Sequence, residues 1–251
     1  MQSLTGDHLR ELRATRYRPA GLVVAAAGNV THEELLEVLS KHGWLDQPAV
    51  SVPASVVVPA TALHGVQVHH ARKDIAQVHV VLGAEGPRHG EKRRYAFELL
   101  STLLGGGMSS RLFQRVREEL GYAYSVYHFH SPYSDVGHHG VYLASAPATA
   151  QKAIDAVREI VADVCANGLP EAEIAAGRQQ LAGQLVMSME SVSARMYRAA
   201  TSALYHESVR TVDEMLADVD AIDVAAVADV AREYFDPTHM TLVSHGPKAV
   251  R

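Results

Sequence analysis

Apolar residues recur along this chain with two spacings, one typical of helices and one typical of strands. Helical spacing predicts helices over residues 4–16, 31–41, 91–104, 149–167, 170–204, 212–217 and 224–234. Alternating or short uninterrupted apolar runs predict strands over residues 22–27, 65–70, 75–83, 122–130, 138–146 and 240–244. Capping residues support several boundaries, since Thr31 and Glu34 form a capping box and Gly168 can end a helix.

The stretch over residues 103–127 carries the densest set of local signals. It reads LLGGGMSSRLFQRVREELGYAYSVY. Three consecutive glycines end an apolar helix, and Ser109 and Ser110 can cap the next one. That helix stops at Gly121, and an aromatic strand follows at once. The glycines of the loop are Gly105, Gly106 and Gly107.

The two ends of the chain resemble one another at a constant offset of 218 positions. Each end contains a helix, an aromatic residue, a proline, an apolar strand and a glycine, so that Pro19 matches Pro237 and Gly28 matches Gly246. A chance similarity of two helix–strand units and an internal duplication both explain this, and the ungapped register favours duplication. We then expect roughly 150 residues of the first copy to lie upstream of residue 1.

This repeat predicts a division of the chain into three segments. Residues 1–46 are predicted to be the tail of a truncated N-terminal domain, because a lone helix–strand–helix cannot bury its own apolar faces. Residues 47–63 contain three prolines and little charge, which predicts an extended linker. Residues 64–251 are predicted to form the complete C-terminal domain. An uncovered apolar face or sheet edge in the first segment predicts association or poor solubility.

Composition argues against several classes of function. The formal net charge is −5 and basic residues are scattered, so no nucleic-acid partner is expected. No apolar run approaches the length of a membrane span, so no membrane partner is expected. The single cysteine, Cys165, excludes an intrachain disulfide and suits a reducing, cytoplasmic compartment. Its place on an apolar helical stripe predicts a core residue rather than a nucleophile.

Several motifs, spaced in the same order, resemble those of the insulinase/pitrilysin-type zinc peptidases, a family that includes the mitochondrial processing peptidases. RKDIAQVHVVLGAEGP at 72–87 is similar to the opening strand of the family's C-terminal domain, and LLGGGMSSRLFQRVRE at 103–118 to its signature helix pair. GYAYSV at 121–126 resembles the next strand, and YRPAGLVVAAAGNVTHEEL at 17–35 resembles the end of the family's first domain. The resemblance implies an α+β fold with an antiparallel-rich sheet and helices mainly on one face, preceded by a truncated sister domain.

In this family only one half of the molecule holds zinc. That half carries an H-x-x-E-H motif, in which two histidines bind the metal and the glutamate activates its water. The present sequence lacks the motif, since His32 is followed by Glu33 and Glu34 but position 36 is leucine. We therefore expect no catalytic residue and no bound metal in this chain, and no proteolysis by the chain alone. Zinc is expected only in the full-length or partnered enzyme.

The function implied by the resemblance is that of the C-terminal, non-zinc half of an inverted-zincin metalloendopeptidase. Such a half clamps a peptide substrate and positions it for proteolysis. The missing zinc half is expected in cis or in trans, and a homo- or hetero-oligomer fits either arrangement. The alternative hypothesis is a non-catalytic binding or scaffolding subunit of a processing-peptidase-like complex.

The resemblance assigns substrate contacts to an arginine and a tyrosine seven residues apart, which here are Arg115 and Tyr122. A guanidinium donates up to five hydrogen bonds and a phenol one, which suits peptide carbonyls near a scissile bond. The competing interpretation is a solvated helix arginine and a packed strand tyrosine. Gly105, Gly106 and Gly107 also have two interpretations, a substrate-facing loop as in the family or a tight turn between packed helices.

Fifteen histidines raise the question of a metal site. His128 and His130 share a face of a predicted strand and could bind zinc together with a third group. The sequence fixes no carboxylate or cysteine near them, so surface or chamber-lining histidines are the favoured interpretation. A serine hydrolase is not supported, because no serine lies in a G-x-S-x-G elbow.

Overall fold

The computed structural model describes residues 3–17, 21–46, 67–205 and 207–251. These residues group into two compact units. One contains the described residues up to 46 together with Val186–Arg210, and the other contains residues 67–185 together with Thr211–Arg251. The predicted linker, residues 47–63, lies outside the described residues, and the predicted domain boundaries stay a prediction.

The larger unit is built on a five-stranded sheet with the order β1-β5-β2-β4-β3. Its strands are β1 (Val68–Arg72), β2 (Val78–Gly86), β3 (Ser125–Pro132), β4 (Gly137–Ser145) and β5 (Thr241–Gly246). All neighbouring pairs are antiparallel except β1 and β5, which are parallel. The predicted antiparallel-rich sheet is therefore confirmed.

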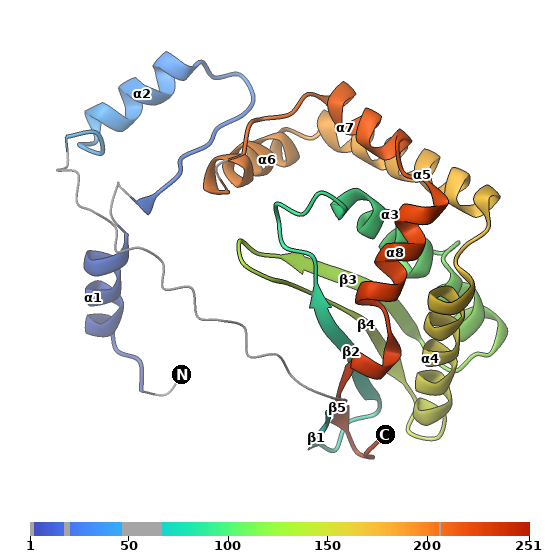
Figure 1. The fold of residues 1–251 in the computed structure, drawn as a ribbon. Coiled ribbons are helices and arrows are strands. Elements are labelled where there is room, and N and C mark those ends of the chain that lie inside the picture. Colours follow the sequence, from blue (N-terminus) through green and yellow to red (C-terminus); the bar gives the residue numbers. More distant parts are fainter. Residues whose placement is uncertain (1–2, 18–20, 47–66, 206) are drawn as a thin grey trace. The chain divides into compact units, whose positions relative to one another are not determined.

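Helices cover one face of this sheet. They are α3 (Arg94–Gly105), α4 (Ala150–Asn167) and α8 (Val224–Tyr234), and α4 and α8 contact one another (Figure 1). Helix α7 (Val212–Asp220) packs on α3. On β2, Val80 and Leu82 are buried against the helices, whereas Val81 between them points to the opposite face and is half-buried. This alternation is what a sheet with one covered face requires. The predicted α+β fold with helices mainly on one face is confirmed.

The predicted helix over residues 170–204 is two helices, α5 (Glu171–Glu190) and α6 (Val192–Leu204). Ser191 lies between them with an extended backbone, and its hydroxyl accepts a hydrogen bond from the N–H of Ala194. A serine in this position caps the second helix and interrupts the first. The apolar spacing continues through the break, so the pattern alone gave no sign of it.

The smaller unit contains α1 (Gly6–Arg16), α2 (His32–Lys41) and α6. The capping box of Thr31 and Glu34 is present as predicted, and Thr5 caps α1. The strand predicted over residues 22–27 is wrong, because this segment has no regular structure and its residues are exposed or half-buried. A strand needs a neighbour for its backbone groups, and the described part of this unit contains no sheet.

The repeat at an offset of 218 positions agrees with the structure in its helical half. Helix α1 over Gly6–Arg16 corresponds residue by residue to α8 over Val224–Tyr234, and the cap residues Thr5 and Asp223 also correspond. The strand half does not agree, since only the C-terminal copy forms a strand, β5. Within the described ranges, no helix is both long and apolar enough to span a bilayer.

Candidate functional site

The segment that carries Arg115 is a π-helix, Phe113–Glu119, rather than the α-helix that the apolar pattern predicts. The wider turn is visible in its closing bonds: the N–H of Leu120 donates to the carbonyl of Arg115 at 3.1 Å, five residues back. Ser110 was also predicted to cap this helix, but its hydroxyl makes a different contact. The hydroxyl of Ser110 donates to the carbonyl of Gly107 at 2.6 Å, so it closes the glycine loop.

Two apolar residues of this helical segment, Leu112 and Val116, are fully buried, as the predicted stripe requires. Arg115 precedes Val116 and is exposed. Because the buried residues hold the helix against the core, the backbone position of Arg115 is fixed. Rigid elements of this kind hold functional side chains more accurately than loops do.

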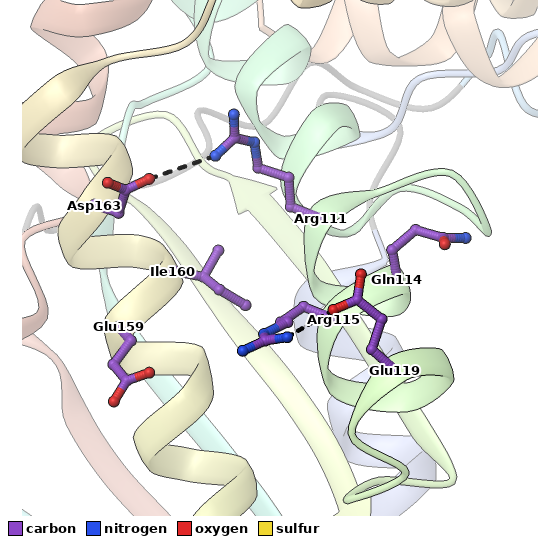
Figure 2. A pocket seen from close by; sticks show the side chains of 7 residues that line it. All are labelled: Arg111, Gln114, Arg115, Glu119, Glu159, Ile160 and Asp163. Atoms are coloured by element: carbon purple, nitrogen blue, oxygen red, sulfur yellow. Dashed lines mark hydrogen bonds and ion pairs between the residues drawn. The ribbon is translucent and has the colours of Figure 1, made fainter.

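Arg115 lines a cavity of about 390 Å³ between this helical segment and α4. The lining residues are Arg111, Gln114, Arg115, Glu119, Glu159, Ile160 and Asp163. Figure 2 shows Arg111 and Arg115 reaching toward α4, which contributes Glu159, Ile160 and Asp163. The cavity thus combines two guanidinium groups with several carboxylates.

The two arginines are held very differently. Arg111 donates two hydrogen bonds to Glu173, at 2.8 and 2.7 Å, and lies 3.6 Å from Asp163. The bond to Glu173 raises the pKa of Arg111, which is therefore a fixed cation. Among the described residues, the Arg115 side chain pairs only with Glu119, at 2.7 Å, and both side chains are more than half exposed, at 55% and 56%. Such an exposed pair contributes only a few tenths of a kcal/mol, roughly, so Arg115 can exchange Glu119 for a ligand at little cost.

Tyr122 does not line the cavity that contains Arg115. Its ring is half-buried against the edge of the core, with the ammonium of Lys152 5.9 Å from the ring centroid. Its backbone is fixed on both sides, since its N–H donates to the carbonyl of Val116 and its carbonyl accepts from the hydroxyl of Ser145. The structure therefore connects Arg115 and Tyr122 through one rigid turn without bringing both into one cavity.

The three glycines of the loop differ in their surroundings. A Cβ at Gly105 would lie 2.3 Å from the backbone nitrogen of His128, so only glycine fits where α3 meets β3. A Cβ at Gly107 would have no atom within 4 Å. Close packing of α3 on β3 thus explains Gly105, and the open surroundings of Gly107 leave room for a ligand. A substrate-facing role for Gly105, Gly106 and Gly107 stays a prediction.

A chain of buried hydrogen bonds, which the sequence did not predict, lies beneath this loop. Ser101 Oγ is 2.6 Å from His128 Nδ1, His128 Nε2 is 2.9 Å from His139 Nδ1, and His139 Nε2 is 2.9 Å from the carbonyl of Tyr234. His128 and His139 are 8% and 1% exposed, so the expectation of surface histidines is wrong for these two. Burial lowers the pKa of His128 well below its usual value and that of His139 to about 4, which keeps both rings neutral.

His128 and His130 do share a face of β3, as predicted, but they are not arranged as metal ligands. His128 bonds directly to His139, and His130 lies 3.2 Å from Glu98 and 3.2 Å from the carbonyl of Pro87. In the described part of the chain, no three histidine, cysteine or carboxylate side chains converge in a way that could hold a metal ion. The alternation of His128 with the buried Val126 was the available signal that this histidine points inward.

Cys165 lies on α4 and packs against the core, and its thiol donates to the carbonyl of Ala231 at 3.2 Å. Burial raises the pKa of this thiol to about 11, so little reactive thiolate exists at neutral pH. The predicted core role of Cys165 agrees with this position.

Comparison with known proteins identifies a family. Residues 3–181 match the family described as "Peptidase M16 inactive domain". The chain is 37% identical to an uncharacterized zinc protease of Streptomyces coelicolor, over 93% of this chain and 52% of that protein. It is 31% identical to an uncharacterized zinc protease of Bacillus subtilis, over 94% of this chain and 56% of that protein. The chain thus spans about half the length of these curated relatives.

Solved structures share the fold at lower sequence identity. A peptidase M16 inactive domain from Pseudomonas fluorescens superimposes with a TM-score of 0.85 at 20% identity, covering 99% of this chain and 59% of that one. A protease from Helicobacter pylori superimposes with a TM-score of 0.84 at 21% identity, covering 98% of this chain and 60% of that one. These two similarities establish the fold and do not assign an activity.

Proposed function

Because this chain belongs to the family of the peptidase M16 inactive domain, we propose that it holds a peptide substrate for a zinc peptidase whose metal lies on another domain. The chain is an inactive domain of zinc-protease-like proteins. The finer assignment is the proposal: the domain grips an extended peptide and positions it, and it does not cleave peptide bonds by itself.

The residues of this chain do not fit a catalytic zinc ion. The sequence contains no H-x-x-E-H motif, and the part of the chain that the structure describes places no three suitable donors together. We therefore assign the zinc and its activated water to a separate half, present in cis or on a partner chain. The relatives that are named zinc proteases support this assignment.

The observation that carries the proposal is the state of Arg115. It lines a cavity, its backbone is fixed by fully buried neighbours, and its ion pair with Glu119 is exposed and weak. A guanidinium in this position can donate several hydrogen bonds to peptide carbonyls. The nearby Arg111 cannot take this role, because Glu173 and Asp163 already occupy it.

Peptide binding by Arg115 is tested with one substitution and a matched control. We expect Arg115→Ala to weaken the binding of a labelled peptide about tenfold, since a hydrogen bond to a charged group contributes roughly 1.5–3 kcal/mol. The control is Arg232→Ala, which removes an exposed arginine paired within its own helix to Asp229. Fluorescence anisotropy measures both affinities. Equal affinity in the two variants would contradict a role of Arg115 in binding.

The proposal that cleavage requires a separate zinc-binding half is tested by reconstitution. We expect the 251-residue chain to show no peptidase activity alone and to raise the activity of a separately expressed domain that carries H-x-x-E-H. A chelator should abolish the activity of the mixture. Chelator-sensitive cleavage by the isolated chain would overturn the proposal.

A second candidate function, a non-catalytic binding or scaffolding subunit, is favoured by a different observation. Tyr122 packs against the core rather than lining the cavity of Arg115, which is what a purely structural pair would do. Under this hypothesis, Arg115→Ala and Tyr122→Ala leave peptide affinity unchanged. Assembly with a partner subunit, measured by light scattering, would then be the property to follow.

A further inference from the structure

The cavity that contains Arg115 is bounded on its other side by α4. This wall consists of Glu159, Ile160 and Asp163. Glu159 and Asp163 are four residues apart, so they lie on the same side of the helix. Figure 2 shows the three side chains across the cavity from Arg115. A ligand that is held by Arg115 therefore also meets the acidic wall on α4.

The two carboxylates on α4 differ in what binds them. Asp163 lies 3.6 Å from Arg111 and accepts a hydrogen bond of 2.7 Å from the side-chain amide of Asn167. Glu159 is exposed, and Figure 2 marks no hydrogen bond or ion pair between it and the other lining residues. Of the two, Glu159 is the acceptor that a ligand can use.

The opposite wall offers a donor. Arg115 pairs weakly with the exposed Glu119. The amide nitrogen of Gln114 is already in use, since it donates to the carbonyl of Met108 at 2.6 Å. A ligand thus finds a guanidinium donor on one wall and a carboxylate acceptor on the other.

An extended peptide matches this arrangement through its backbone. In an extended chain the N–H and C=O groups of one residue point to one edge, and those of the next residue point to the opposite edge. A peptide between the two walls would present a carbonyl to Arg115 and an N–H of the adjacent residue to Glu159. Ile160, which is half-buried and packed against the core, offers an apolar contact between them. The cavity volume of about 390 Å³ lies within the range of roughly 300–1,000 Å³ that ligand pockets occupy.

We propose that Glu159 is a second peptide-binding residue, which accepts a backbone N–H of the peptide whose carbonyl is bound by Arg115. A hydrogen bond from an N–H to a carboxylate is stronger than one to a neutral acceptor. An anionic ligand would also be attracted by Arg115, but Glu159 would repel it. The inference rests on the proposed peptide-holding function and adds a contact that does not depend on the side chains of the peptide.

The first measurement compares variants of the full chain by fluorescence anisotropy. The probe is an uncharged, blocked peptide, Ala-Ala-Leu-Ala-Leu-Ala-Ala, with a neutral fluorophore. We expect Glu159→Ala to weaken binding about three- to tenfold, as an exposed, charge-assisted hydrogen bond allows. Glu159→Gln should lose less, because its amide oxygen still accepts. Asp155→Ala is the matched control, since Asp155 lies one turn earlier on α4, accepts from Gln151 and does not line the cavity, and its affinity should be unchanged.

The second measurement identifies the N–H that Glu159 binds. Each amide of the peptide is replaced in turn by an ester, which removes one N–H and keeps the shape of the chain. At one position the ester should weaken binding to the wild type at least threefold more than it weakens binding to Glu159→Ala. Equal losses in both proteins at every position would overturn the role of Glu159. A loss in Glu159→Gln as large as in Glu159→Ala would overturn it too, because charge and not the acceptor would then be required.

Failure of the proposed function has a different outcome. If Arg115→Ala weakens peptide binding and Glu159→Ala does not, the peptide-holding function stands and the contact with Glu159 is overturned. If the wild type binds none of the peptides, both proposals are overturned. Urea unfolding of each variant checks that the fold is intact, which the exposure of Glu159 leads us to expect.

Discussion

The buried chain from Ser101 to Tyr234 determines the protonation of its two histidines. The carbonyl of Tyr234 can only accept, so His139 Nε2 carries a proton and His139 Nδ1 accepts one from His128 Nε2. His128 Nδ1 must then accept from the hydroxyl of Ser101. With both rings neutral, each donor in this chain has one acceptor. An added proton would reverse the hydrogen bonds from His139 to Ser101 and place a positive charge on a buried ring, which burial disfavours.

Stability should therefore fall as the pH falls from about 6.5 to about 4. The pKa of both histidines is lower in the folded protein than in the unfolded chain, so their contribution is complete above the unfolded value and is lost on acidification. For His139, whose pKa is about 4, the loss is on the order of 3 kcal/mol. Urea unfolding at several pH values measures it. His139→Asn should lower stability at pH 8 and flatten the pH dependence, and an unchanged slope would contradict the assignment.

Gly105 and Gly107 give a matched pair for the loop. Gly105→Ala should destabilise the protein by about 1–3 kcal/mol or more, because its Cβ would lie 2.3 Å from the backbone of β3. Gly107→Ala, with no atom within 4 Å of its Cβ, should leave stability nearly unchanged. Urea unfolding compares the two. If Gly107→Ala lowers peptide affinity at unchanged stability, the loop contacts substrate, and if it does not, the tight-turn interpretation is sufficient.

At the scale of elements, Arg111 and Glu173 link α5 to the helical turn that precedes the π-helix Phe113–Glu119. Both are largely shielded from solvent, with side chains 29% and 27% exposed, and their two-pronged contact joins segments 62 residues apart. Arg111→Met should keep the aliphatic packing and cost about 1–2 kcal/mol by leaving Glu173 without its partner. Thermal unfolding measures the loss, and Arg232→Met on α8 is the control. Equal melting temperatures would show that solvent screens the Arg111 pair completely.

Sequence predicted most elements because their boundaries depend on local chemistry. The capping box at Thr31 and the helix-ending glycine Gly168 are short-range signals, and both are present in the structure. The sequence did not predict the π-helix, because an apolar stripe looks alike in an α-helix and a π-helix. It did not predict the break at Ser191 either, because the apolar spacing continues across this one-residue interruption. The strand over residues 22–27 failed for a long-range reason, since no local pattern can supply a neighbouring strand.

The candidate site was predictable only in part, for the same reason. The spacing of Arg115 and Tyr122 can be read directly in the sequence, but which of them lines a cavity depends on how α4 packs against the π-helix. His128 and His139 are separated along the chain, and only the register of β3 and β4 brings them together.

At the scale of the whole molecule, the two copies of the repeat differ in what covers them. Leu9 and Leu12 on α1 correspond to Val227 and Val230 on α8 at the offset of 218 positions. The two valines are 1% and 0% exposed, whereas the two leucines are 58% and 49% exposed. The same apolar spacing is thus buried against a sheet in one unit and uncovered in the other. Burying each leucine would gain roughly 1.5–3 kcal/mol, which favours a partner surface for α1.

We therefore expect α1 to mediate association, with a second copy of this chain or with a separately supplied zinc half. The double substitution Leu9→Glu and Leu12→Glu should lower the apparent mass by multi-angle light scattering and weaken binding to such a half at least tenfold. It should leave the unfolding of the larger unit unchanged, because α1 lies in the other unit. A control on the polar side of the same helix, Arg13→Glu, changes charge without removing apolar surface. If this control disrupts association as strongly, charge rather than the apolar stripe holds the partner, and if neither variant has an effect, α1 is not an interface.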